Sequence, residues 1–292
     1  MRGPAGETGQ GADPTLPLPT LDLPAVAPGR GYAPPAYRPV APGARRHRVR
    51  ALLRRLTITV VALVLLGIVA FGGLLILTPS VSDARERVQA QDLAHHAAYP
   101  GPAVPARFAE SLVATEDKRF YSEPGIDLFA VGRVGLSYVT GHGIQGGATL
   151  YQQLAKLLYT QGRSSASDEA EQVALAVKLY LTYTRPQILQ MYADVVYFGH
   201  GYYGLAAASC GYFGVRPAGL SWPQAAMLAG LVQGPSLDDP LTHPGHARAR
   251  EAHVVGRLVA TGRLAPAQGR AALAVPLPSL IARAGRGCSR SA

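Results

Sequence analysis

The residues with the clearest potential for chemistry are an acidic pair, Glu116 and Asp117, at the end of an apolar segment. Phe108, Leu112 and Thr115 follow helical spacing up to Glu116, which predicts a helix docked on the core with the acids at its end. A carboxylate placed there in a groove can accept a proton from a substrate hydroxyl. Acidic pairs also occur at solvated helix ends, so the pair alone leaves both interpretations open.

A second segment, 146–158, combines a glycine turn with a predicted helix. Its buried face is predicted by four leucines at helical spacing: Leu150, Leu154, Leu157 and Leu158. Gln152 and Lys156 lie four residues apart on another face, with Gln153 beside them. The N–H groups and positive dipole end that follow Gly146 and Gly147 suit an anion such as a diphosphate. Gly-Gly before a helix is equally common as an ordinary turn.

These two segments belong to a longer series of motifs over residues 103–263. In order, the motifs are E-D-x-x-F (116–120), P-G-I-D (124–127), G-G-x-T-x-x-Q-Q-x-A-K (146–156), Q-I-L-Q-M-Y (187–192), Y-F-G (197–199), Y-G (203–204), Y-F-G (212–214) and A-A-M-L-A-G-L (225–231). The series resembles glycosyltransferase family 51, the peptidoglycan glycosyltransferase domain of bifunctional penicillin-binding proteins and monofunctional transglycosylases.

The resemblance implies a fold, a reaction and roles for particular residues. The fold would be mainly α and lysozyme-like, with a small membrane-facing lobe. The reaction would join lipid II disaccharide units into glycan strands, with lipid II and the nascent strand as partners. By resemblance Glu116 is the general base and Asp117 an orienting partner. The donor diphosphate site would be formed by Thr149, Gln152, Gln153 and Lys156.

Several positions depart from the family pattern. Ungapped counting puts Gln172 at the family's second catalytic glutamate, and Asp168 and Glu169 at the basic residues before it. The other departures are Glu123 for a histidine, Ala148 for a serine, Tyr151 for a hydroxyl residue, Leu157 for an asparagine, Gln190 and Gln224 for glutamates, and Asp194 for an asparagine. Glutamine carries no charge to bind a divalent cation or assist diphosphate release, so we expect attenuated activity.

Three functions are compatible with these residues. The first is a membrane-anchored peptidoglycan glycosyltransferase. The second is a non-catalytic relative that binds lipid II or a cell-wall synthesis protein, as the loss of the second acid indicates. The third, which the transferase motifs make less attractive, is a glycan hydrolase acting through Glu116. No cofactor is required by the sequence, although the resemblance leaves a divalent cation (Mg or Mn) open.

A predicted transmembrane helix and a basic cluster precede the domain. Residues 56–77 carry no charge over 22 positions, which as a helix would span about 33 Å, enough for a hydrocarbon core of roughly 30 Å. Six arginines lie in 45–55, so the N-terminal side is expected in the cytoplasm and the domain outside the cell membrane. The predicted organisation is a disordered Pro/Gly-rich tail (1–44), a basic cluster (45–55), a single transmembrane helix (56–78), a linker (79–102), the glycosyltransferase-like domain (103–263) and a basic tail (264–292).

The charge and the cysteines exclude other classes. Of the net charge of +10, +6 falls on residues 1–55, and basic residues do not alternate with aromatic ones, so we expect no nucleic-acid partner. Cys210 and Cys288 form no metal motif. Because Cys288 lies in the basic tail, two free thiols are expected, although pairing outside the cell stays open.

The secondary-structure pattern is helical nearly throughout, so the predicted class is mainly α. Helices are predicted over 125–143 (part), from Ser167 as N-cap to 183, over 186–194 and 204–213, from Ser221 as N-cap to 232, and over 245–261. Strand signals are nearly absent.

Overall fold

The computed structural model describes residues 43–127, 148–276 and 288, with side chains from residue 48 onward. The chain divides into two units, Met1–Thr59 and Val60–Ala292. Residues 1–42 of the predicted tail (1–44), the Gly146-Gly147 turn and most of the predicted helix within 125–143 lie outside the described residues, and residues 43 and 44 belong to the first helix.

Helix α1, Gly43–Leu77, contains both the basic cluster and the apolar stretch. Its part Arg48–Leu77 is long and apolar enough to cross a membrane, by length and composition. The helix begins before the predicted apolar segment, so the arginines continue the same helix.

The remaining described elements are helical. They are α2 (Ala84–Ala94), α3 (Ala106–Glu116), α5 (Leu150–Leu158), α6 (Ala166–Thr182), α7 (Arg185–Val195), α8 (Leu205–Phe213), a short 3₁₀ turn η1 (Pro217–Gly219), α9 (Trp222–Leu231), α10 (Pro244–Ala260) and α11 (Pro266–Ala274). Over residues 43–127 and 148–276 no strand forms, and between α7 and α8 two residues, Tyr197 and Tyr203, make an isolated bridge. The mainly α class is therefore confirmed.

Two predicted N-cap residues can be compared with the structure, those of α6 and α9. Helix α6 begins at Ala166, and its N-cap is Ser165, not Ser167, because Asp168 at the third helical position completes a capping box with Ser165. Helix α9 does begin after Ser221, as predicted.

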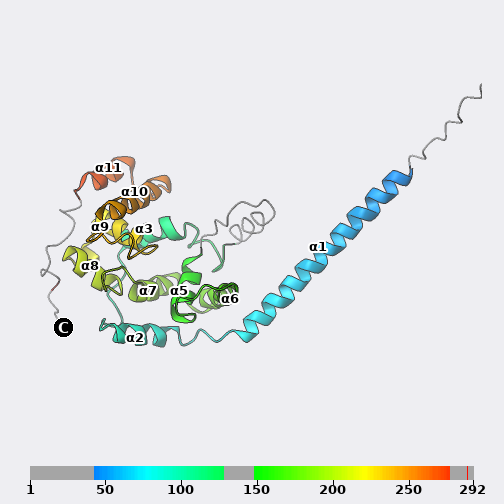
Figure 1. The fold of residues 1–292 in the computed structure, drawn as a ribbon, viewed down its shortest axis with the longest axis horizontal. Coiled ribbons are helices and arrows are strands. Elements are labelled where there is room, and N and C mark those ends of the chain that lie inside the picture. The colour runs from blue at the N-terminus through cyan, green and yellow to red at the C-terminus, as the bar shows by residue number, and fades with distance from the viewer. Residues whose placement is uncertain (1–42, 128–147, 277–287, 289–292) are drawn as a thin grey trace, which may run out of the picture. The chain divides into compact units, whose positions relative to one another are not determined.

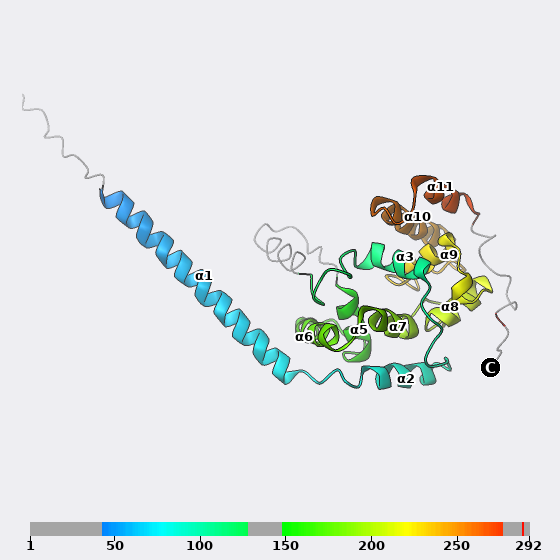
Figure 2. The same ribbon diagram turned by 180° about the vertical axis from the view of Figure 1, so that it is seen from behind.

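One continuous apolar core joins the helices of the domain. In both views α3 lies with α9 and α10, while α5, α6 and α7 form a neighbouring group (Figures 1 and 2). Phe108, Leu112, Leu154 and Tyr192 are almost completely buried in it. Burying each such side chain contributes roughly 1.5–3 kcal/mol, so α3, α5 and α7, which carry the predicted site, are fixed by the core.

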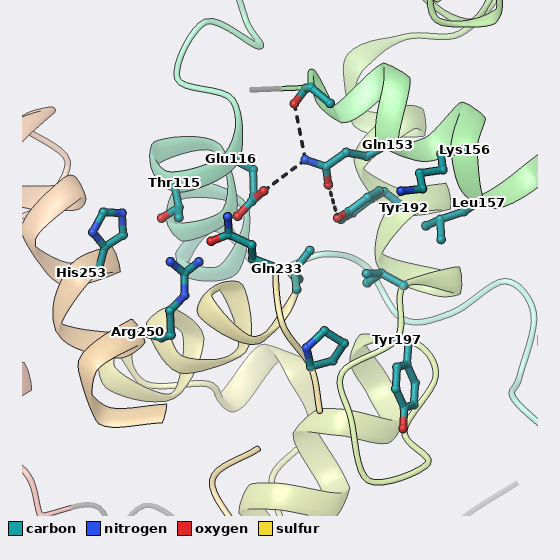
Figure 3. A pocket seen from close by; sticks show the side chains of 14 residues that line it. Thr115, Glu116, Gln153, Lys156, Leu157, Tyr192, Tyr197, Gln233, Arg250 and His253 are labelled. Carbon is teal, nitrogen blue, oxygen red and sulfur yellow. Dashed lines mark hydrogen bonds between the residues drawn. The ribbon is translucent and has the colours of Figure 1, made fainter. Parts of the chain in front are cut away.

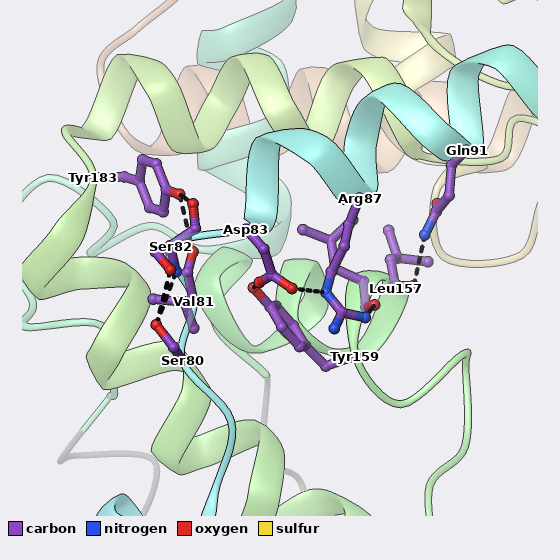
Figure 4. A network of polar contacts seen from close by, with 10 residues as sticks. Ser80, Val81, Ser82, Asp83, Arg87, Gln91, Leu157, Tyr159 and Tyr183 are labelled. Atoms are coloured by element: carbon purple, nitrogen blue, oxygen red, sulfur yellow. Dashed lines mark hydrogen bonds and ion pairs between the residues drawn. The ribbon is translucent and has the colours of Figure 1, made fainter.

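The segment 79–102, expected to be a linker, contains α2. Its Ala84 and Val88 are fully buried in the core, together with Val81 just before it. Polar contacts accompany this packing: Tyr183 donates its hydroxyl to the carbonyl of Val81 at 2.9 Å (Figure 4). The segment is therefore part of the folded domain.

The region expected to be a basic tail also contributes structure. Helix α11 packs beside α10, with Ala272 buried. Cys288 forms a disulfide with Cys210 of α8, the two Cα atoms being 5.2 Å apart. The expectation of two free thiols was wrong, because the chain after α11 returns to α8, 78 residues away in sequence.

Candidate active site

A pocket of about 560 Å³ opens where α3, α5, α7 and α10 meet the turn after α9 (Figure 3). Its lining consists of Thr115, Glu116, Ala148, Gln153, Lys156, Leu157, Tyr192, Val196, Tyr197, Val232, Gln233, Pro235, Arg250 and His253. Of the predicted site residues, Glu116, Gln153 and Lys156 come together here. The cluster consists of one carboxylate, amides and cationic side chains.

Glu116, the last residue of α3, presents its carboxylate to the pocket. Its Oε2 accepts a hydrogen bond from Gln153 Nε2 at 3.1 Å. Burial raises the pKa of Glu116, while the Gln153 hydrogen bond and the positive charge of Arg250 oppose the rise. The carboxyl is thus shifted toward neutrality yet remains ionisable, as a general base requires.

Gln153 is fixed from its other side by Tyr192 of α7. The Tyr192 hydroxyl donates to Gln153 Oε1 at 2.6 Å, so the amide nitrogen must point toward Glu116. Because Tyr192 is buried in the core, the Tyr192–Gln153–Glu116 chain holds the carboxylate in one orientation.

Lys156 lies one turn beyond Gln153 on α5 and also lines the pocket (Figure 3). Among the described residues no carboxylate pairs with its ammonium, which leaves its charge available to an anion. Leu157, predicted to lie on the buried face with the other three leucines, instead lines the pocket beside it. Leu150, Leu154 and Leu158 are buried as predicted.

The N-terminus of α5 differs from the predicted anion site. Asp117 Oδ2 accepts from the backbone N–H of Leu150 at 2.9 Å, and Thr149 Oγ1 accepts from that of Gln152 at 3.2 Å. The Gln152 side chain in turn accepts from the Thr149 N–H at 2.9 Å. A carboxylate at a helix N-terminus is favoured by the helix dipole, so these N–H groups already have acceptors. Asp117, Thr149 and Gln152 therefore lie outside the pocket lining and fix the start of α5.

Glu123 lies buried beside Asp117, with 5% of its surface exposed. Burial and the nearby Asp117 charge raise the pKa of Glu123 to about 8. Glu123 is thus neutral at pH 7, while Asp117 stays the acceptor for α5. The acidic residue in the family's histidine position therefore places no second charge beneath the pocket.

Gln172, predicted at the second catalytic acid position, is not among the pocket-lining residues. It is buried in α6, 7% exposed, and its Nε2 donates to Thr160 Oγ1 at 2.8 Å and to the Arg163 carbonyl at 2.9 Å. Both contacts need an amide donor. The side chain therefore fixes the turn between α5 and α6.

Helix α10 also contributes to the pocket, which was not predicted from the sequence. Arg250 and His253 project from one face of α10, and Arg250 points toward Glu116 and Gln233 (Figure 3). Burial and the charges of Arg250 and Arg257 lower the pKa of His253, so it is neutral at pH 7. The i, i+3 spacing of Arg250 and His253 was a visible signal, but nothing in the sequence indicates which element that face meets.

The described residues do not fit a metal centre. Within them, no three His, Cys, Asp or Glu side chains come close enough together to hold an ion. At the position of the family's second acid, the uncharged Gln172 is already engaged with Thr160 and Arg163. The part of the chain that the structure describes therefore offers no ligand set for a divalent cation.

The fold and pocket together define a helical domain in which one carboxylate faces cationic side chains, an arrangement suited to moving a proton beside an anionic group. The chain belongs to the transglycosylase family: the family profile described as Transglycosylase matches residues 85–259, more than half of the chain. This confirms the predicted family and supports a glycosyltransferase activity in general. The match begins inside α2, in agreement with its packing.

The similar proteins differ in how much of their own length this chain covers. A candidate transglycosylase of Cupriavidus necator is 30% identical over 77% of this chain and 99% of its own length. Penicillin-binding protein 1A of Aquifex aeolicus is 35% identical over 60% of this chain but only 24% of its own length. The crystal structure of penicillin-binding protein 1A from Haemophilus influenzae matches 61% of this chain and 17% of its own, with 21% identity and a TM-score of 0.36.

Proposed function

We propose that this protein is a membrane-anchored peptidoglycan glycosyltransferase that polymerises lipid II with attenuated activity. The observation that carries the proposal is the convergence of Glu116 with Lys156 and Arg250 in one pocket. A glycosyl transfer from a lipid diphosphate needs a base and positively charged side chains that stabilise the departing diphosphate.

In the proposed step, Glu116 takes the proton from the 4-hydroxyl of the acceptor sugar. The freed oxygen attacks C1 of the donor sugar, and the bond between C1 and the diphosphate oxygen breaks. The lipid diphosphate leaves with the electron pair of that bond, and Lys156 stabilises its negative charge. The Tyr192–Gln153 hydrogen bonds keep the Glu116 carboxylate aimed at the pocket.

The proposed location follows from α1 and from the substrate. A lipid-borne sugar is most accessible to a domain tethered at the bilayer, and α1 is long enough to provide the tether. The arginines near its start favour a cytoplasmic N-terminus, with the domain outside the cell membrane.

Attenuation is proposed because the position of the second acid carries no charge. This supports a second candidate, a non-catalytic relative that binds lipid II or a cell-wall synthesis partner, since the Gln172 amide is committed to Thr160 and Arg163. The retained base in an open pocket favours the enzyme.

Labelled lipid II separates the candidates when incubated with the full chain in detergent. Glycan polymer, resolved by gel electrophoresis, is expected for the transferase. Saturable binding without polymer would support the binding protein, and cleavage of preformed glycan would indicate a hydrolase. If the assay shows neither binding of lipid II nor any product, both the transferase and the lipid II-binding protein are contradicted.

A further inference from the structure

The C-terminal end of α5 is held by side chains from α2, the helix that follows α1 in the chain. Gln91 Nε2 donates to the Leu157 carbonyl at 3.1 Å, and Arg87 Nη1 donates to the Leu158 carbonyl at 3.3 Å (Figure 4). The last carbonyls of a helix have no donors within the helix. These two bonds therefore satisfy the end of α5 from a segment more than 60 residues away.

Three side chains strengthen this connection. Tyr159, the C-cap of α5, donates its hydroxyl to Asp83 Oδ1 at 2.9 Å, and Arg87 Nε donates to Asp83 Oδ2 at 2.8 Å. The Arg87 guanidinium also lies over the Tyr159 ring, 4.5 Å from its centroid. Asp83, Arg87 and Tyr159 thus hold the start of α2 against the end of α5 (Figure 4).

The chain entering α2 is fixed as well. Lys178 of α6 donates to the carbonyls of Thr78, at 2.7 Å, and Pro79, at 2.9 Å, directly after α1 ends at Leu77. Tyr183, directly after α6, donates its hydroxyl to the carbonyls of Val81 and Ser82. The backbone between Thr78 and α2 is therefore held by hydrogen bonds to α6 and to Tyr183. The position of α2 is therefore set by its contacts with the domain.

We propose that α2 positions the pocket, with Gln91 and Arg87 as positioning residues that act on Lys156 through the last turn of α5. Leu157 lines the pocket with its side chain and gives its carbonyl to Gln91, and Lys156 is its immediate neighbour. No described carboxylate fixes the Lys156 ammonium, so its place depends on the backbone beneath it. The proposal deepens the proposed function, on which its anionic ligand rests.

The sharpest test replaces the Gln91 donor with an acceptor of the same shape. Gln91→Glu would set a carboxylate against the Leu157 carbonyl, whereas Gln89→Glu makes the same change at an exposed position of the same helix. Gln91→Met removes the donor without adding charge, and Gln91→Lys restores a donor.

Two readouts on the full chain in detergent separate a positioning role from a loss of folding. Amide hydrogen exchange should rise at Tyr159 and Gly162, whose N–H groups bond to Ala155 and Lys156, in Gln91→Glu and Gln91→Met but not in Gln89→Glu or Gln91→Lys. The Kd for undecaprenyl diphosphate should rise roughly fivefold in the first two variants. In the polymerisation assay kcat/KM should fall by a similar factor in these two variants, because Lys156 is proposed to stabilise the leaving diphosphate.

Equal exchange and equal Kd in Gln91→Glu and wild type would overturn the proposal, as would the same effects in Gln89→Glu. If the wild-type chain binds no undecaprenyl diphosphate, the anionic ligand of the proposed function is contradicted. The exchange comparison then still decides whether α2 holds the end of α5, so the two failures are distinguishable.

Discussion

Two positions that correspond by resemblance to catalytic acids have opposite surroundings in this domain. Glu116 ends α3 at the wall of an open pocket, where Gln153 and Arg250 act on its carboxylate. Gln172 is buried in α6, and both contacts of its amide nitrogen are to acceptors, Thr160 and Arg163. The difference teaches that the Glu116 carboxylate is available to a ligand in the pocket, whereas the Gln172 amide is engaged in holding the turn between α5 and α6.

Other residues that depart from the family pattern make hydrogen bonds to nearby residues of the chain. By resemblance, Gln190 and Asp194 correspond to a glutamate and an asparagine of the family, and Gln190 Nε2 donates to Asp194 Oδ1 at 2.8 Å. The amide and the carboxylate have simply exchanged places. Gln224 accepts from the Ser221 N–H at 3.0 Å, as a glutamate in a capping box would. Of these three glutamines, only Gln172 stands where the family has a catalytic acid.

The largest effect on the rate is expected from removing the proposed base, Glu116. Glu116→Gln keeps the shape of the side chain but cannot take a proton, so polymerisation of lipid II should fall by about 10²–10⁴-fold. Glu110→Gln is the matched control, because Glu110 lies on the same helix and pairs with Arg263 outside the pocket lining. Polymer formation that survives Glu116→Gln would show that another group is the base.

Removing the positive charge of Lys156 should lower the rate less. Lys156→Met preserves the length of the side chain and removes its charge, so the rate should fall roughly 10–100-fold through weaker stabilisation of the leaving diphosphate. Lys118→Met, at an exposed position directly after the acidic pair, should leave the rate within about twofold. Equal rates for the two variants would remove Lys156 from the mechanism.

What the sequence could predict depends on how local the interaction is. The leucine spacing predicted α5, and the motif resemblance predicted that Glu116 and Lys156 share a site, as the pocket lining shows. The capping role of Asp117 was missed, since its partner Leu150 lies 33 residues away. Arg250 was missed for the same physical reason: helical spacing defines a face, but not what that face meets.

The pH dependence of activity sharpens the comparison, since of the two positions, 116 and 172, only Glu116 carries a titratable side chain. Burial raises its pKa and a base must be ionised, so activity should fall as pH drops, with a midpoint above that of an ordinary glutamate, about 4.3. Gln153→Met removes a hydrogen bond that lowers this pKa, so the midpoint of the activity profile should move to higher pH. Gln89→Met is the control. An unmoved midpoint in Gln153→Met would mean that the measured limb belongs to another group.

The smallest change in rate is expected where sequence comparison alone predicts a gain. If Gln172 lay at the second acid position beside the substrate, Gln172→Glu would increase polymerisation. In the structure a carboxylate there would face the Arg163 carbonyl with no donor to offer, so we expect a rate within about threefold of wild type and stability lower by roughly 1–3 kcal/mol. Thermal unfolding measures the loss, and Gln172→Met, which lacks the donor and the charge, should lose less. A tenfold gain in rate would place residue 172 at the substrate, and the role assigned to its amide would then be wrong.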